Sequence, residues 1–413
     1  MLGLSISWVI LMLRQVPCMQ GGNSFDNSCY SDIPVLYHWR GMRDGLIPII
    51  EAELEYPVGS ALLMEAARRL IPLFASYDDA SAAAAAYFGI NAVILFALMG
   101  VTVWAMTRMA RPGDALLVAL SPAVMTTGLI NWDAGAVVLS VLALLAWSRK
   151  KPILTGVLLG LGVAVKLYPL FFLGPLAVLC LRTGRMRAFL ATFGTGVLTW
   201  VAINLPYYLA NPQNWFYFWT FNYDERGPDL GSFWLVLSQL GQEPTNLSRA
   251  EIVLMLLGCI VIALLLLFAS KRPRLVQGCF LVLTWFLIIN KVYSPQYVLW
   301  LLPLLVLANP RKLSWVIFSI AETGYFFAVW AYLAAARDGG EYRFYWVAIA
   351  VRVLVQLWLC AQVVADIIIP ERDPMGQALR EIDEGLFSDM SDVGWLAKVR
   401  EKSVRMLSSS REN

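Results

Sequence analysis

Long apolar runs, separated by short polar turns, dominate this sequence. A helix needs about 20 consecutive apolar residues to cross the hydrocarbon core of a bilayer. Five runs have about that length or more: 81–107, 188–206, 250–270, 313–336 and 344–369. Charged residues make up only 15% of the 413 positions, whereas 59% are hydrophobic. These runs predict an all-α polytopic membrane protein.

Several further runs are apolar but shorter than a full span. They are residues 115–130, 134–147, 153–167, 168–181, 275–290 and 297–308. The run from Met1 to Leu13 is interpreted as a first span that lacks some upstream residues. The sequence therefore predicts about 12 transmembrane helices.

Basic residues orient these helices, because Lys and Arg collect in cytoplasmic turns. Thirteen of them lie in five turns, at 108–114, 148–152, 182–187, 271–274 and 311–312. With these turns inside, both termini are cytoplasmic, and the long loops 14–80 and 206–249 lie outside. Segment 57–80 carries several charges, so we expect an amphipathic helix on the outer surface there. Residues 1–369 then form one membrane domain, and 370–413 form a charged cytoplasmic tail.

The composition also excludes several functions. The cations are not gathered in one stripe, which argues against nucleic-acid binding. His38 is the only histidine, which excludes His-rich metal sites and argues against Ser-His-Asp hydrolysis. No Walker sequence is present. Cys18 and Cys29, the two cysteines of an outer loop, are either paired or free thiols.

Polar groups stand at the outer ends of several short apolar runs. They belong to the segments Asn131-Trp132-Asp133, Lys166-Leu167-Tyr168-Pro169 and 290–297. A run of 14 residues is about 21 Å long as a helix, so it cannot lift its end fully into outer water. Ionisable residues at that depth indicate a water-filled functional cavity. The alternative is structural pairing, for example of Asp133 with a lysine.

The outer loops supply a complementary set of groups. Lysines at the membrane surface suit a phosphate, and the first loop offers the acids Asp32, Glu51, Glu53 and Glu55. A carboxylate above a cationic, apolar groove suits proton removal from a hydroxyl. The pattern indicates group transfer from a lipid-phosphate donor to an extracytoplasmic acceptor.

Five motifs carry a family resemblance. CYSDIPVLY, EYPVG, NWD, KLYP and NKVYSPQYVLWLLP occur in this order, and together they resemble actinobacterial members of glycosyltransferase family 87. These enzymes belong to the C-type superfamily of membrane glycosyltransferases. The resemblance implies about a dozen helices with a large first outer loop. It also implies inverting transfer of a hexose, usually mannose, from a polyprenyl-phosphate donor to a glycolipid or glycan acceptor.

The resemblance and the pattern of polar groups together give expected roles for residues of this chain. Asp32 matches the acid that acts as catalytic base, and Lys166 and Lys291, helped by Arg226, would hold the donor phosphate. Glu55 and Tyr56 would order the loop or the sugar. The other expected donor- or substrate-binding residues are Asn131, Asp133, Tyr168, Tyr293 and Gln296. A histidine near the donor has no counterpart except His38, in the first loop.

The sequence also gives expectations for cofactors, for the location of the protein and for alternative functions. No cofactor is required, although Mg²⁺ or Mn²⁺ held by Asp32 and Glu55 is left open. The plasma membrane is the expected location, with the active site outside. A lipid or sugar transporter or flippase is the main alternative, because broken helices and buried charges fit it as well. A non-catalytic assembly partner is the third.

Overall fold

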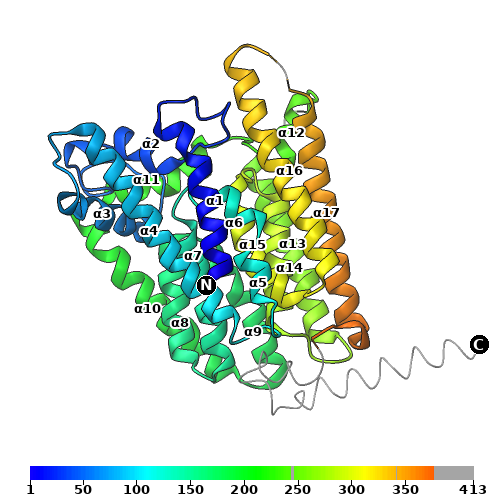
Figure 1. The fold of residues 1–413 in the computed structure, drawn as a ribbon. Helices are drawn as coiled ribbons and strands as arrows, with labels where there is room; N and C mark the ends of the chain where they lie inside the picture. The colour runs from blue at the N-terminus through cyan, green and yellow to red at the C-terminus, as the bar shows by residue number, and fades with distance from the viewer. Residues whose placement is uncertain (243–245, 341, 376–413) are drawn as a thin grey trace, which may run out of the picture.

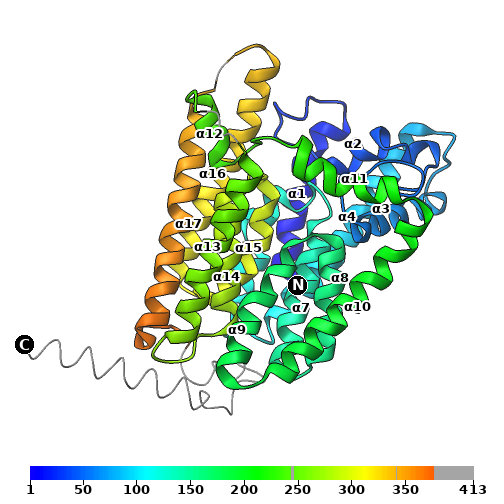
Figure 2. The same cartoon turned by 180° about the vertical axis from the view of Figure 1, so that it is seen from behind.

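The computed structural model describes residues 1–242, 246–340 and 342–375, and the regular elements of these ranges are helices. Figures 1 and 2 show long helices running side by side, with short helices gathered at one end of the bundle. Within the described ranges no β-strand forms. The fold class predicted from the apolar runs is therefore confirmed.

Within the described residues, six helices are long and apolar enough to cross a membrane. They are α1 (Leu2–Met19), α4 (Ala80–Met106), α10 (Met186–Ala210), α13 (Leu247–Phe268), α16 (Lys312–Arg337) and α17 (Phe344–Ile368). Shorter apolar helices complete the set: α7 (Asp133–Ser148), α8 (Pro152–Val165), α9 (Leu173–Thr183), α14 (Leu275–Ile289) and α15 (Val298–Ala308). The protein is a multi-pass membrane protein.

One predicted span is broken in the structure. Residues 115–130 form two short helices, α5 (Ala115–Ala119) and α6 (Pro122–Thr127). Pro122 has no backbone N–H to donate into a preceding turn. The Ser121 hydroxyl instead accepts a hydrogen bond from the Ala123 amide at 3.2 Å and starts a new helix. The sequence Ser-Pro thus ends one helix and begins the next.

Helices from the N-terminal half of the chain pack mainly on one another, and so do helices from the C-terminal half. Helix α8 packs between α7 and α10, α7 packs on α4, and α14 contacts α13, α15 and α17. Helices α10 and α13 stay largely unburied along their apolar lengths. These exposed apolar faces are the surfaces that a bilayer would cover.

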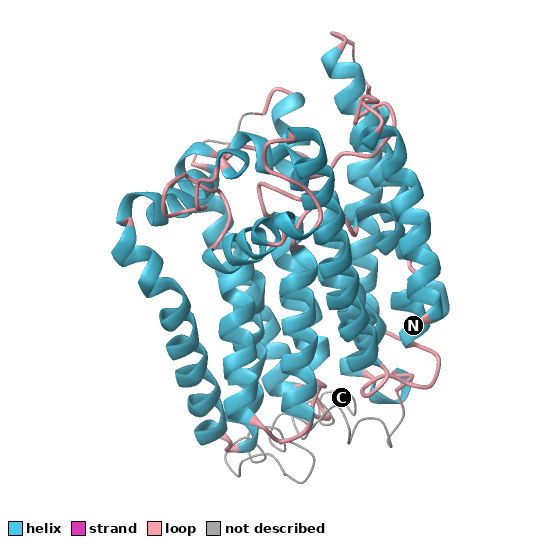
Figure 3. Cartoon of the chain, turned by 60° about the vertical axis from the view of Figure 1, so that its left-hand side comes forward, coloured by secondary structure: helices cyan, strands magenta, loops and turns pink. Residues whose placement is uncertain are grey.

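Both predicted outer loops contain helices. The first contains α2 (Asp32–Trp39), the 3₁₀ turn η1 (Met42–Asp44), α3 (Val58–Arg69) and the 3₁₀ turn η2 (Ile71–Leu73). The second contains α11 (Pro212–Thr220), the π-turn η4 (Phe221–Glu225) and α12 (Phe233–Gln239). Helix α3 has 12 residues and packs on α4, α8 and α10. Figure 3 shows the short helices lying over one end of the bundle.

Three of the five basic turns meet one another through the segment after α17. Arg111 donates to the Pro374 carbonyl at 3.4 Å, Arg311 donates to the Arg372 carbonyl at 2.8 Å, and Arg274 pairs with Asp373 at 3.0 Å. Residues 370–375 are therefore packed against the membrane domain. The rest of the predicted tail, 376–413, lies outside the described residues.

Candidate active site

A cavity of about 1070 Å³ opens among α2, α13, segment 221–230 and segment 289–297. Eight of the predicted site residues line it: Asp32, Glu55, Tyr56, Lys166, Tyr168, Arg226, Lys291 and Gln296. The other three, Asn131, Asp133 and Tyr293, are buried and lie outside this lining. His38 is exposed and does not line the cavity either.

Asp32 is the first residue of α2, and its position is fixed by backbone contacts. Ser31 precedes it as the N-cap, with its hydroxyl accepting from the Ile33 amide at 3.2 Å. The same hydroxyl donates to the Leu129 carbonyl at 2.6 Å, and the Asp32 amide donates to the Ile130 carbonyl at 2.7 Å. These bonds hold Asp32 against the segment that leads into the Asn-Trp-Asp motif.

Two tyrosines contact the Asp32 carboxylate. The Tyr56 hydroxyl donates to Oδ2 at 2.7 Å, and the Tyr30 hydroxyl also hydrogen-bonds to it. Burial raises the pKa of Asp32 above the usual aspartate value, while these bonds and the charge of Lys166 act in the opposite direction. A carboxylate with a raised pKa is a better proton acceptor than a solvated one.

A short chain of polar groups runs behind Asp32. The Asn131 amide donates to the Tyr56 hydroxyl at 3.3 Å, and the Asn131 carbonyl oxygen accepts from the Asp133 amide at 3.0 Å. Because Tyr56 accepts from Asn131, its own proton is directed at Asp32. Asn131 therefore orients Tyr56 without lining the cavity.

Lys166 forms a buried ion pair with Asp133. The ammonium lies 3.2 Å from Asp133 Oδ1, and the two side chains are 13% and 1% exposed. The ammonium also lies 4.4 Å from the Tyr56 ring centre and 5.7 Å from that of Tyr297. The pairing of Asp133 with a lysine, the structural alternative raised from the sequence, is present. Lys166 still lines the cavity.

Lys291 occupies a different setting. Its ammonium donates to the Ser248 hydroxyl at 3.0 Å and to the Tyr223 carbonyl at 3.1 Å, both neutral acceptors. Burial lowers the pKa of Lys291, the charge of Glu251 raises it, and the nearby charge of Arg226 lowers it again. Arg226 itself pairs with Asp229 at 2.6 Å. Two cations thus lie close together on one side of the cavity, and such a pair suits an anion.

The loops that carry these two cations are joined through their backbones. The Asp229 amide donates to the Lys291 carbonyl at 2.8 Å, and the Tyr293 amide donates to the Leu230 carbonyl at 3.0 Å. This pairing fixes Arg226 and Lys291 relative to each other.

A buried polar cluster behind these loops was not predicted. Arg352 of α17 donates to the Tyr293 carbonyl at 2.7 Å and pairs with Glu322 of α16 at 2.9 Å. Gln356 donates to Glu322 at 2.8 Å and also contacts the Tyr293 hydroxyl. Tyr293 therefore belongs to the support of the loop. The sequence did contain a sign of this cluster, because the apolar runs 313–336 and 344–369 each include charged residues.

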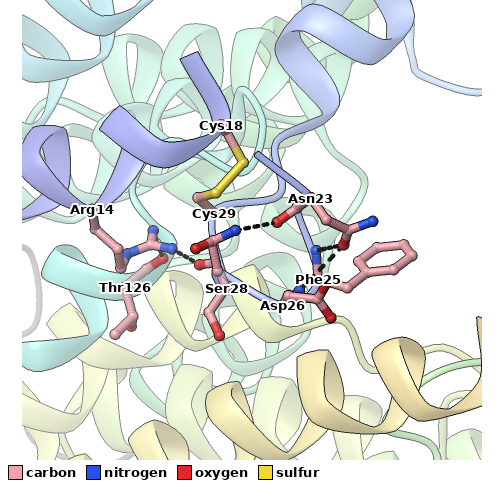
Figure 4. The surroundings of a disulfide bond; sticks show 9 residues. Arg14, Cys18, Asn23, Phe25, Asp26, Ser28, Cys29 and Thr126 are labelled. Atoms are coloured by element: carbon pink, nitrogen blue, oxygen red, sulfur yellow. Dashed lines mark hydrogen bonds between the residues drawn. A yellow bond between two sulfur atoms is a disulfide. The ribbon is translucent and has the colours of Figure 1, made fainter. Parts of the chain in front are cut away.

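Figure 4 shows the disulfide bond between Cys18 and Cys29. Arg14 donates to the Ser28 carbonyl beside it and to the Thr126 carbonyl of α6. The disulfide, one of two possibilities left open by the sequence, is thus present. It closes the loop immediately before Tyr30 and Asp32.

The acids of the first loop are partly engaged elsewhere. Glu55 pairs with Arg40 at 2.7 Å. Among the described residues, no group of three or more His, Cys, Asp or Glu side chains is arranged to hold a metal ion. A divalent cation between Asp32 and Glu55 stays a prediction.

Comparisons with known proteins give two likenesses. The sequence model of glycosyltransferase family 87 matches residues 55–289. Among solved structures, ArnT from Cupriavidus metallidurans bound to undecaprenyl phosphate is 14% identical, with a TM-score of 0.44. That match covers 90% of this chain and 77% of ArnT. No curated protein matches the sequence.

Proposed function

Because the chain belongs to glycosyltransferase family 87, we propose that it transfers a hexose, which we take to be mannose, from a polyprenyl-phosphate donor to an extracytoplasmic glycolipid or glycan. The observation that carries the proposal is one cavity lined both by a tyrosine-bonded carboxylate, Asp32, and by two neighbouring cations, Lys291 and Arg226. A sugar between these groups would have a base on one side and a phosphate site on the other.

In this mechanism Asp32 is the general base. The acceptor hydroxyl gives its proton to Asp32 while its oxygen forms a bond to the anomeric carbon of the donor sugar. The bond from that carbon to the phosphate oxygen breaks, and the electron pair leaves with the polyprenyl phosphate. Attack opposite the leaving group inverts the anomeric centre. A positioned base contributes about 10²–10⁴-fold to the rate.

The cations would stabilise the leaving phosphate. Lys291 and Arg226 are already fixed by the backbone pairing of their loops, so little reorganisation is needed when charge develops. Lys166 adds a third cation near Asp32, with its charge partly compensated by Asp133. No step of this mechanism uses a metal ion.

The extracytoplasmic position of the cavity is also part of the proposal. The Cys18–Cys29 disulfide precedes the base directly, and disulfides persist in oxidising compartments. Three basic turns meet at the end of the bundle that carries residues 370–375, and basic turns favour the cytoplasm. Both observations support cytoplasmic termini and an outward-facing site.

The substitution Asp32→Asn tests the assignment. Asn keeps the shape of the side chain and can still accept from Tyr56, but it does not take up a proton. With purified protein and polyprenyl-phosphate-mannose labelled in the sugar, we expect transfer to a mannoside acceptor to fall at least about 10²-fold. Donor binding should stay near that of the unchanged protein.

The matched control is Asp44→Asn, at an exposed aspartate of η1 that does not line the cavity. It should leave transfer unaffected. Near-normal turnover by Asp32→Asn would remove Asp32 from the mechanism. A protein that bound or moved the donor without any transfer, even when unaltered, would instead support the transporter alternative.

A further inference from the structure

One face of α2 runs along the cavity, away from the proposed base. Asp32, Val35, Leu36 and Trp39 all line the cavity. Their spacing of three, four and seven residues places them on one side of the helix. Seven residues of helix advance by about 10 Å. The cavity wall therefore continues well beyond the point where the reacting hydroxyl would lie.

Trp39 stands at the far end of this face and is unusually open. It is 81% exposed, although it lines the cavity. The adjacent backbone is held in place, since Arg40 pairs with Glu55 at 2.7 Å and lies over the Tyr217 ring at 5.7 Å. The position of Trp39 is thus fixed while the indole ring remains available for contact.

The charge of this face suits the acceptor better than the donor. Its only ionisable group is Asp32, and the residues between Asp32 and Trp39 that line the cavity are apolar. The cations that suit a phosphate, Lys291 and Arg226, come from other segments. An anionic donor would be attracted to that side, which leaves the α2 face for a neutral ring.

We propose that the α2 face from Asp32 to Trp39 is an acceptor subsite, with Trp39 as a platform for a second sugar ring. The inference rests on the proposed function and narrows the acceptor to a glycan of at least two sugar units. A pyranose presents C–H groups on one side, and an aromatic ring offers a large, rigid surface for them. The terminal sugar would place its hydroxyl at Asp32, and the next sugar would pack on Trp39.

An exposed Trp near a bilayer could alternatively act as an interfacial anchor. The two roles differ in what can replace the indole ring. A sugar platform needs an aromatic surface, so Trp39→Tyr should retain most of the effect and Trp39→Leu should not. An anchor needs only apolar contact with lipid, so Trp39→Leu should be the better replacement.

The test compares octyl glycosides of one and of two mannose units as acceptors in transfer assays with purified protein. The unaltered enzyme should prefer the disaccharide. We divide the KM for the one-mannose acceptor by the KM for the two-mannose acceptor. In Trp39→Ala and Trp39→Leu we expect this ratio to fall about fivefold, the scale of one aromatic packing contact. Donor KM should not change. Trp104→Ala is the matched control, since Trp104 is 48% exposed on α4 and does not line the cavity.

Saturation-transfer NMR measures acceptor binding without turnover. It therefore tests the acceptor subsite separately from the proposed transfer activity. Absence of transfer by the unaltered protein would overturn the proposed function. Disaccharide binding that is indifferent to Trp39→Ala, or restored by Trp39→Leu, would overturn the subsite alone. An unchanged KM ratio in Trp39→Ala would do the same.

Discussion

Lys166 and Lys291 occupy similar places in two similar segments of the molecule. Each follows a short apolar helix, α8 or α14. Each comes two residues before a tyrosine, and a 3₁₀ turn with proline in its first positions follows, η3 (Tyr168–Phe172) or η5 (Pro295–Tyr297). Both lysines line the same cavity. Their local sequences give little reason to expect different roles.

Their partners differ, however. The ammonium of Lys166 faces a buried carboxylate, that of Asp133, whereas the ammonium of Lys291 faces a hydroxyl and a carbonyl. Lys166 is therefore in a direct ion pair, whereas the ammonium of Lys291 is held by neutral acceptors and lies near both the opposite charge of Glu251 and the like charge of Arg226. In the proposed function, two similar lysines would therefore serve the base side and the phosphate side of one cavity, and the groups that they pair with distinguish them.

The largest expected effect concerns the buried pair. Lys166→Met leaves the Asp133 carboxylate buried without its cation, a change that costs about 3–5 kcal/mol in comparable pairs. We expect a clear fall in thermal stability of the purified protein in detergent. Lys291→Met loses two hydrogen bonds to neutral acceptors and the attraction of Glu251, which keeps its hydrogen bond from the Lys291 backbone amide, so it should lower stability much less.

The double variant Lys166→Met/Asp133→Leu sharpens this comparison. Replacing both charges by apolar groups removes the uncompensated carboxylate, so most of the lost stability should return. If Lys166→Met is no less stable than Lys291→Met, the two lysines do not differ in the way their contacts indicate.

An intermediate effect is expected at Lys291. A lost hydrogen bond to a charged group costs about 1.5–3 kcal/mol, so Lys291→Gln should weaken binding of polyprenyl phosphate about tenfold or more. Binding of the uncharged polyprenol should change little. Arg249→Gln is the matched control, because Arg249 is an exposed cation at the start of α13 and does not line the cavity.

Equal weakening of both lipids by Lys291→Gln would place the phosphate elsewhere. Lys166→Gln would then become the informative variant for the phosphate. Its stability would have to be restored by an accompanying change at Asp133 before its donor affinity could be interpreted.

The sequence predicted the position of a site residue well where the length of one helix set its depth in the membrane. A helix as short as α7 brings Asp133 into the interior, and the only question left open was whether Asp133 served a cavity or a pair. The structure shows that it pairs with Lys166, which itself lines the cavity. The charges within segment 57–80 likewise predicted that it would not span, and the helix that forms there, α3, has only 12 residues.

The sequence was uninformative where distant segments meet. The backbone pairing of residues 229–230 with 291–293, and the Arg352 contact to the Tyr293 carbonyl, join positions about 60 residues apart. No local pattern encodes such contacts, because they depend on how the helices pack. For the same reason Tyr293 was expected to bind the donor, although it is buried among α16 and α17 side chains.

The smallest expected effect concerns the pH dependence on the base side. Asp32 acts in its ionised form, so kcat/KM should fall as the pH drops through its pKa. Burial raises that pKa, and the hydrogen bond from Tyr56 opposes the rise by stabilising the carboxylate. Tyr56→Phe removes this bond from both the ionised and the neutral carboxyl group, so the pKa reflects only the difference between the two bonds. That difference is about 1 kcal/mol, or about 0.7 of a pH unit. The acid limb of the kcat/KM profile should therefore move upward by about that amount.

The phenyl ring of Tyr56→Phe keeps the contact with the Lys166 ammonium, so the hydroxyl is the main change on this side of the cavity. Lys291→Gln, on the phosphate side, should leave the midpoint of the acid limb in place while it weakens donor binding. A midpoint that moves with Lys291→Gln but not with Tyr56→Phe would mean that the titrating group belongs to the phosphate side. The base would then have to be sought there, and Glu251, which lines the cavity and accepts from the Lys291 amide, would be the first candidate.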